Sequence, residues 1–350
     1  MKADTAVFEN KSNMANTGKN QPCPCGSGKI YEDCCFIEDI LPADRMDAQA
    51  FTQAVLELLE SRKFKSPAEA QAFIDKLTRA LNVAPLEDFS GVSPEQMYHF
   101  LHRPFDSPGL IDYNLTIRRF PDTPFFRLFL HLMQGVAKEE LKATAEGNLP
   151  VKFVKVAAEQ YFGAQEYSKM QRYISFRTET DFSALHTVRL LAQMAGIIRK
   201  YKGRFQATKT GQSVVEQGMD GRAFLALFKT HTRKFNWAYG DRYPDIPTIQ
   251  QSFLFTLYLL SKYGDSLRPS SFYGDLFLKA FPVALQETPP VSFEEREETL
   301  LSCYALRTLG RFAHFLGFIE IEGSDNDRWI EKRAVKKTSF LDEWLRISLS

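Results

Sequence analysis

The chain of 350 residues is 44% hydrophobic and 25% charged, which is the balance of an ordinary soluble globular protein and enough chain for two or three domains. Its 44 Lys and Arg are matched by 43 Asp and Glu, so the net charge of +1 excludes a protein that binds nucleic acid through overall basicity. Runs of about 18 apolar residues are missing, so we expect no membrane-spanning helix and no membrane partner.

The first segment, residues 1–20, is polar and lacks the apolar stretch of a secretory signal. It predicts a disordered leader and a cytoplasmic location. In the reducing cytoplasm, clustered cysteines favour a metal site over disulfides.

A cysteine-rich segment follows, 22-PCPCGSGKIYEDCC-35, with four of the five cysteines of the chain in the pattern C-x-C-x8-C-C. A structural zinc site requires four soft ligands at the corners of a tetrahedron, and two pairs on either side of a short loop supply them. Gly26 and Gly28 allow the positive φ angles with which the loop turns back on the metal. Cys23 and Cys25 lie before the loop, and Cys34 and Cys35 lie after it.

Two other chemistries fit this segment less well. A disulfide between the adjacent Cys34 and Cys35 is strained, and the compartment disfavours pairing across the loop. A phosphate-binding loop requires Ser or Thr after Gly-Lys and a strand before it, whereas Ile30 follows Lys29 here. We therefore predict one structural Zn²⁺, with Lys29 and Tyr31 on an exposed face of the knuckle that contacts a partner.

The segment closely resembles the SEC-C motif, C-P-C-G-S-G-K-x-Y-x-x-C-C, over residues 21–37. That zinc module forms the tail of the bacterial preprotein translocase motor ATPase and is appended to many other proteins. The resemblance implies that the four cysteines are the zinc ligands. It also implies a protein or ribosome-associated partner, although the acidic Glu32-Asp33 stands where the family often has lysines.

Residues 38–138 are predicted to form a helical region. Apolar residues recur at helical spacing over 39–62, and Ser-Pro signals at Ser66 and Ser93 begin two further helices, to about Leu81 and over 94–103. The apolar stretch within 107–135 predicts a buried segment.

Residues 139–220 have the order of a winged helix-turn-helix unit. A helix is predicted from about residue 150 after a Gly-Asn-Leu-Pro turn, and a second over 182–195. Two short strands follow at 197–201 and 204–207, and Thr208-x-x-Gly211 begins another helix.

Basic residues gather on this unit, which makes nucleic acid the second candidate partner. Phosphate contacts would come from Arg199, Lys202, Arg204 and Lys209, with Arg189 and Lys200 nearby. The helix 182–195 is expected to expose only His186, Arg189 and Gln193 as polar groups, which is a small set for reading bases.

The remaining chain is divided into an aromatic-rich helical region, 221–292, and a C-terminal part, 293–350. The latter is predicted to be a long amphipathic helix to Gly317, strands at 318–321 and 333–337, and a final segment, which would be a second winged-helix-like unit. Residues 140–350 also resemble a group of uncharacterised bacterial and plasmid-borne proteins that share the GNLP turn and the K-G-x-[YF]-x-x-T-x-x-G hairpin.

No constellation of residues predicts catalysis. His99 and His102 lie one turn apart without a metal-site spacing, and the histidines are interpreted as surface or hydrogen-bonded core side chains. Cys303 is expected to be a buried thiol, and the acidic run at 294–298 a solvated helix start. The six histidines are His99, His102, His131, His186, His231 and His314.

The sequence therefore predicts a mainly α protein with an N-terminal zinc knuckle, a helical body and winged-helix-like segments with small β wings. We expect a non-enzymatic, zinc-binding cytoplasmic protein whose knuckle docks on a protein or translation-related partner. The alternative is a winged-helix regulator that binds nucleic acid. A third interpretation is an enzyme with an unrecognised site in the aromatic-rich middle of the chain.

Overall fold

A computed structural model describes residues 21–22, 30–31, 53, 56, 64, 66–138, 141–173, 175–289, 293–322 and 333–349. The predicted leader and nearly all of the helix predicted at 39–62 lie outside these residues. The described chain is mainly helical with small sheets, as predicted. None of its helices is long and apolar enough to cross a membrane. The chain divides into two compact units, residues 1–102 and 103–348.

The first unit contains α4 (Pro67–Val83) and α5 (Pro94–His102), which pack against each other. Both helices begin where the sequence predicts. The Ser66 hydroxyl accepts a hydrogen bond from a first-turn amide at 3.2 Å. Ser93 exchanges two hydrogen bonds with Gln96, at 2.9 and 3.2 Å, in a capping box that satisfies free amides of the helix start.

The second unit opens with a group of elements between residues 124 and 217. Helix α6 lies at its centre and packs on α7, α9, α10 and the hairpin. A short extended segment at 141–143 pairs with β3, and β3 pairs with β2, so three extended segments lie side by side. The elements are α6 (Pro124–Ala137), α7 (Val151–Phe162), α8 (Ala164–Met170), η3 (Glu179–Asp181), α9 (Ser183–Met194), β2 (Ile198–Tyr201), β3 (Arg204–Ala207) and α10 (Lys209–Gln217).

A second group between residues 253 and 344 repeats this order of helix, short strand, helix, helix, hairpin and helix. Its sheet has the strand order β4-β6-β5, in which the short first strand again pairs with the last strand of the hairpin. The elements are α13 (Phe253–Tyr263), β4 (Arg268–Pro269), α14 (Ser270–Ala280), α15 (Phe293–Tyr304), the π-helical η5 (Ala305–His314), β5 (Ile319–Glu322), β6 (Ala334–Lys337) and α16 (Ser339–Trp344).

The two groups share one detailed arrangement of hydrogen bonds. The Thr208 hydroxyl donates to the Gly196 carbonyl at 2.7 Å, and the Thr338 hydroxyl donates to the Gly317 carbonyl at 2.6 Å. Each threonine follows the hairpin and each glycine, at φ 73° and 85°, ends the helix before it. The repeat therefore extends from topology to individual bonds, which supports two copies of one structural unit.

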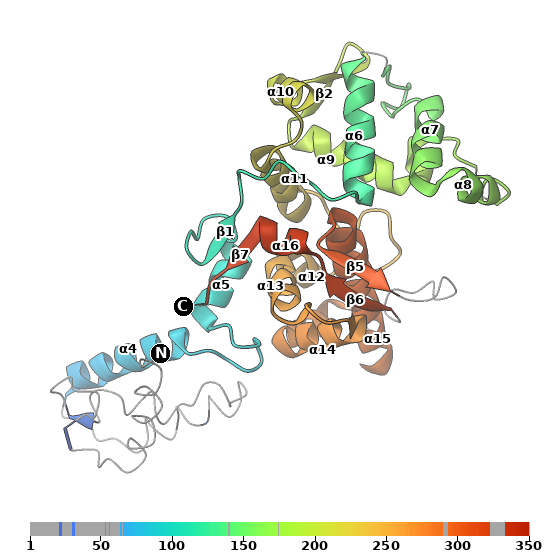
Figure 1. Ribbon diagram of the computed structural model, residues 1–350. Coiled ribbons are helices and arrows are strands. Elements are labelled where there is room, and N and C mark those ends of the chain that lie inside the picture. The colour runs from blue at the N-terminus through green and yellow to red at the C-terminus, as the bar shows by residue number, and fades with distance from the viewer. Residues whose placement is uncertain are drawn as a thin grey trace, which may run out of the picture. The chain divides into compact units, whose positions relative to one another are not determined.

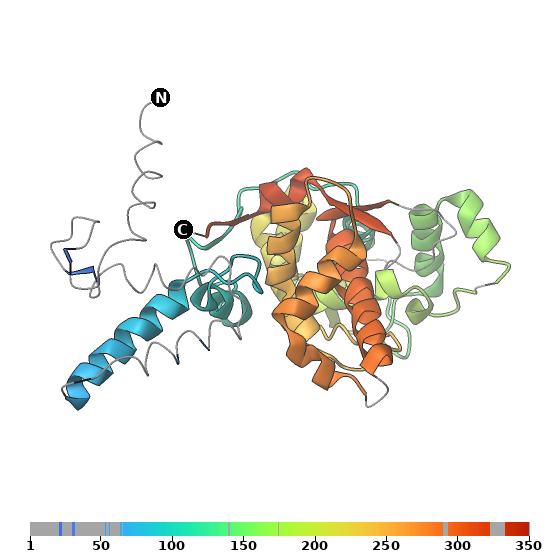
Figure 2. The same ribbon diagram turned by 90° about the horizontal axis from the view of Figure 1, so that it is seen from below.

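Five further elements lie before, between, within or after the two groups and connect them. These are β1 (Ile111–Tyr113), α11 (Gly221–Arg233), α12 (Pro247–Gln251), η4 (Pro282–Glu287) and β7 (Leu345–Ile347). Strand β1 pairs with β7. Phe224 and Phe228 of α11 contact Trp344 edge to face, with ring centroids 4.6 and 6.1 Å from that of Trp344, in an aromatic core. The green elements α6–α8 and the orange-to-red elements α13–α15 form two groups of helices (Figures 1 and 2).

The starts of α7 and α10, both ends of α9 and the hairpin lie within a residue or two of prediction, whereas α8 and η3 were not predicted. The C-terminal helix follows its prediction in extent, but its second half is a π-helix, a form common near functional sites. Strands β1 and β4 were not predicted, because each has two or three residues and owes its extended form to a distant partner.

Candidate functional site

The described residues of the cysteine motif form a closed frame. The Tyr31 amide donates to the Gln21 carbonyl at 2.7 Å, and Pro22 and Ile30 form an antiparallel bridge. Gln21 and Pro22 directly precede the first cysteine pair, and Tyr31 lies shortly before the second. The frame therefore holds residues 22 and 30, which flank the first cysteine pair in the sequence, next to each other. The cysteines themselves, and Lys29, lie outside the described residues, so their role stays a prediction.

Tyr31 is a correction to the sequence prediction. Its side chain is 5% exposed, so it does not lie on an open face of the knuckle, whereas Ile30 beside it is 40% exposed. A large aromatic side chain gives a very small module more stability by packing than by facing water. The exposed face accordingly includes Ile30.

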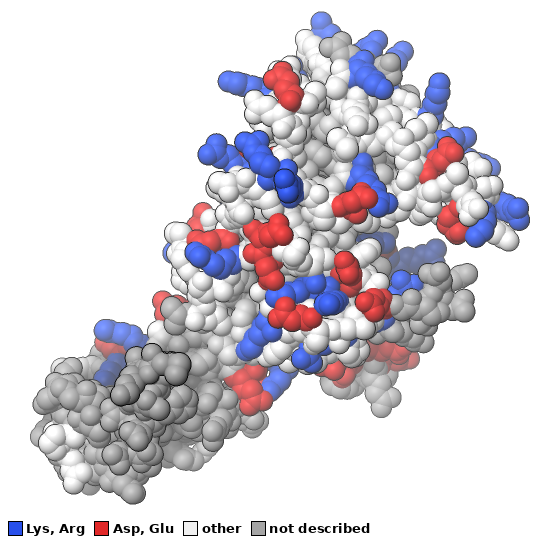
Figure 3. Space-filling view, in the orientation of Figure 1, with Lys and Arg blue, Asp and Glu red and all other residues white. Residues whose placement is uncertain are grey.

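The basic residues of the first group divide into an exposed set and a buried one. Arg199, Lys200, Lys202 and Arg204 are exposed on the β2–β3 hairpin, and Lys209 is exposed at the start of α10. Arg199 and Lys202 both lie over the Tyr201 ring, 5.4 Å from its centroid. Blue side chains gather at the upper end of Figure 3, over the part of the molecule that carries β2 and α10.

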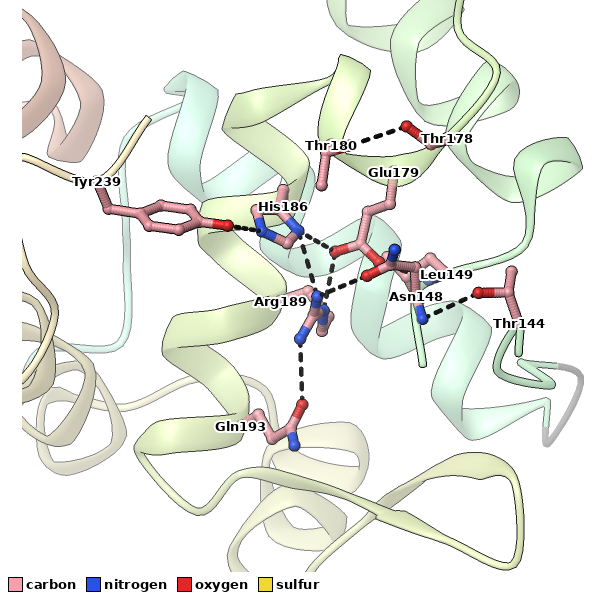
Figure 4. A network of polar contacts seen from close by, with 10 residues as sticks. All are labelled: Thr144, Asn148, Leu149, Thr178, Glu179, Thr180, His186, Arg189, Gln193 and Tyr239. Atoms are coloured by element: carbon pink, nitrogen blue, oxygen red, sulfur yellow. Dashed lines mark hydrogen bonds and ion pairs between the residues drawn. The ribbon is translucent and has the colours of Figure 1, made fainter. Parts of the chain in front are cut away.

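The polar residues of α9 contradict the sequence prediction. His186 and Arg189 are each only 6% exposed, because their side chains turn inward to Glu179 of η3. Glu179 is fully buried and accepts from His186 Nδ1 and Arg189 Nε, both at 2.8 Å, and from the Leu149 amide. Arg189 also reaches Gln193 and Asn148 (Figure 4). Helix α9 therefore offers few polar groups to an outside partner.

This arrangement sets the state of both acid and imidazole. Burial alone would raise the pKa of Glu179, but the bonds from His186 and Leu149 and the charge of Arg189 outweigh it and hold that pKa below its usual value. Because a carboxylate only accepts, His186 Nδ1 carries a proton. In the neutral ring Nε2 then accepts from the Tyr239 hydroxyl, 3.0 Å away.

A second buried ion pair lies in the C-terminal group. Arg307 of η5 donates to both carboxylate oxygens of Asp241, at 2.9 and 2.8 Å, and both side chains are 2% exposed. The guanidinium also donates to the carbonyls of Tyr243 and Pro244, and Arg311 lies 3.4 Å from the same Asp241. Arg307 and His186 correspond in the repeat, since each stands ten residues before the glycine that ends its helix.

A cavity of about 350 Å³ separates α9 from η5. His186, Tyr239 and Arg307 line it, together with His231 of α11 and Arg311 and His314 of η5. Sequence reasoning assigned the histidines no shared site, yet three of the six meet here. The signal available was the aromatic run Phe235–Tyr239 between the two groups, although no spacing connects it to residues 186 or 307.

Cys303, His99 and His102 were also considered as functional residues in the sequence. Cys303 is fully buried, which confirms the expected core thiol, and burial raises its pKa to about 12. His99 is half-buried and His102 exposed on α5. Among the described residues no three His, Cys, Asp or Glu side chains are grouped to hold a metal.

Comparison with known proteins gives two matches. The SEC-C motif matches residues 20–36, and the Y4jL N-terminal domain matches residues 123–220. The first confirms the predicted resemblance of the cysteine segment to a generally zinc-binding motif. The second spans α6 to α10, the first copy of the repeat. Neither the curated proteins nor the solved structures contain a match to the chain.

Proposed function

We propose that this protein is a non-enzymatic, cytoplasmic zinc-binding adaptor. Its SEC-C knuckle holds one structural Zn²⁺ on Cys23, Cys25, Cys34 and Cys35 and docks on a protein partner, of which a translation-related assembly is the candidate class. The observation that carries the proposal is the match of residues 20–36 to the SEC-C motif, and the closed frame of residues 21–22 and 30–31 supports it.

The bound ion would supply folding energy rather than chemistry. Four thiolates fill a tetrahedral zinc, so no position remains for a catalytic water. A module of this size has little core of its own and depends on the metal to fold. The docking face would then be Lys29 with the half-exposed Ile30, a cation beside an apolar side chain.

The body is proposed to be a pair of winged-helix-like units. Both groups have the helix–strand–helix–helix–hairpin order and the same strand arrangement. In a DNA-binding winged helix the third helix enters the major groove. Here α9 turns His186 and Arg189 inward, and both third helices, α9 and η5, contribute to the wall of one cavity. The body is therefore better suited to a scaffold than to reading bases.

Affinity capture with three variants of the full-length chain tests docking. We expect the parent to retain a partner that Cys34→Ser/Cys35→Ser loses together with zinc, and that Lys29→Ala/Ile30→Ser loses while keeping zinc. Lys336→Ala, an exposed lysine on β6, is the matched control and should behave as the parent. A partner retained equally by all variants would exclude docking through the knuckle.

The alternative function is nucleic-acid binding through the exposed hairpin. Its support is the exposed cationic set Arg199, Lys202, Arg204 and Lys209, which fits phosphate contacts without base readout. Removing one side chain that pairs with a phosphate should reduce the slope of log affinity against log salt by about 0.9 for duplex DNA. Binding that weakens steeply with salt, and further in Lys202→Ala/Arg204→Ala, would favour this function over the adaptor.

A further inference from the structure

The cavity between α9 and η5 has a wall of unusual charge. Its seventeen lining residues include two arginines and three histidines but neither Asp nor Glu. The two acids behind the wall are already bonded. Glu179 is fully buried behind His186, and Asp241 is shared by Arg307 and Arg311. A ligand in the cavity therefore meets hydrogen-bond donors and positive charge.

Arg311 is the cation with most freedom to bind a ligand. Its side chain is 43% exposed, and its only hydrogen bond among the described residues is a long one to Asp241, at 3.4 Å. Asp241 already receives two shorter bonds from Arg307. The remaining acid near Arg307 is Asp245, which is solvent-exposed and does not line the cavity. The guanidinium of Arg311 thus has donors left for an anion.

Much of the remaining wall is aromatic. The His231 ring stacks between Phe235 and Phe312, with centroids 5.8 and 5.6 Å away, and lies 5.5 Å from Trp237. Burial lowers the pKa of His231 to about 3, so this ring is neutral and acts as part of the apolar wall. Its Nδ1 is buried and makes no hydrogen bond to any described residue. Half-exposed Tyr239 brings a hydroxyl to the same wall.

We propose that this cavity binds a small planar organic anion, an aromatic carboxylate of about two fused rings. The carboxylate would pair with Arg311, and the rings would lie against Trp237, Phe235 and Phe315. The volume lies at the lower end of the range of ligand pockets, about 300–1,000 Å³. A guanidinium can donate two parallel hydrogen bonds to the two oxygens of a carboxylate, which a single-atom anion does not offer.

This ligand site is independent of the zinc knuckle, because every residue that forms it belongs to the unit 103–348. In the full-length protein, it would place an occupant against both third helices of the repeat. His186 and Arg307, the corresponding residues of the two copies, would flank it. The ligand would then stabilise the second unit as a whole.

Isothermal titration of the full-length protein with 2-naphthoate tests the proposal, with neutral 2-naphthalenemethanol as the matched probe. We expect naphthoate to bind and the alcohol to bind at least about tenfold more weakly, because it lacks the charge-assisted bond. Arg311→Gln should reduce naphthoate affinity by a similar factor and leave the alcohol unaffected. Arg242→Gln, an exposed arginine outside the cavity, should match the parent.

A second variant distinguishes binding of the probes inside the cavity from binding at the protein surface. Thr187→Phe adds a ring to the cavity wall from α9 and should abolish binding of both probes while the protein keeps its unfolding temperature within a few degrees. Three results would overturn the proposal: no binding of naphthoate, equal affinity for the two probes, or an unchanged affinity in Arg311→Gln.

Discussion

Replacing Glu179 by Gln should destabilise the second unit strongly. The change keeps the shape of the side chain but removes the one negative charge bonded to Arg189 among the described residues, and the Arg189 side chain is 7% exposed. An uncompensated buried charge typically costs about 3–5 kcal/mol, whereas the loss of one neutral hydrogen bond costs about 1 kcal/mol. We therefore expect a loss of roughly 3–5 kcal/mol in the free energy of unfolding.

Urea unfolding followed by tryptophan fluorescence measures this loss, since Trp237 and Trp344 are both buried in the unit. The double variant Glu179→Gln/Arg189→Met removes the orphaned charge as well, so it should recover much of the stability. Glu216→Gln, an exposed glutamate on α10, is the matched control and should unfold with the parent. A Glu179→Gln protein within about 1 kcal/mol of the parent would refute the account of the network.

The same carboxylate predicts an acid dependence. The pKa of Glu179 in the folded protein lies below the ordinary 4.5. The stability that its negative charge contributes is therefore fully present at pH values well above 4.5. This stabilisation is lost as the pH falls below 4.5 and through the lower pKa that Glu179 has in the folded protein. The stability difference between parent and Glu179→Gln should therefore shrink on acidification and stay constant between pH 6 and 8.

Three further experiments test other parts of the fold. Thr338→Val should cost about 1 kcal/mol, because it removes the hydroxyl bond to the Gly317 carbonyl. Thr208→Val should cost about 1 kcal/mol more, because it removes the equivalent bond to Gly196 and also the cap on the Gly211 amide. Exposed Thr210→Val should cost nothing measurable, and no loss in either Thr208→Val or Thr338→Val would argue against the shared arrangement. Asp241→Asn should cost roughly 3–5 kcal/mol by leaving Arg307 buried without a countercharge, and adding Arg307→Met should restore much of it. Cys303, buried and with a thiol pKa of about 12, should resist alkylation at pH 8 in the folded protein, and labelling of Cys303 before unfolding would contradict the packing.

Features that depend on nearby residues were predictable from the sequence. The helix starts at Ser66, Ser93 and Thr208 follow from side-chain caps within three residues of each position. The hairpin turn at Lys202-Gly203 has positive φ at both residues, as a tight two-residue turn requires. The cysteine spacing was equally informative about the motif, because the pattern C-x-C-x8-C-C lies within residues 20–36, which match the SEC-C motif.

Features that depend on distant residues were not predictable. Asp241 and Arg307 are separated by most of the second repeat, and nothing in their neighbourhoods marks them as partners. His186 and Arg189 fall on the polar positions of α9 in the sequence pattern, but Glu179, just before the helix, turns them inward. The cavity could not be predicted from hydrophobic periodicity or from the spacing of motif residues, because its wall combines residues from both copies and from the segment between them.

The most direct test of the central claim is the zinc content of the full-length protein, measured by native mass spectrometry with elemental analysis. We predict one zinc ion per chain, lost in both Cys23→Ser/Cys25→Ser and Cys34→Ser/Cys35→Ser, with the urea midpoint of the second unit unchanged. A parent protein without zinc, or either double variant that retains it, would contradict a knuckle held by these four cysteines.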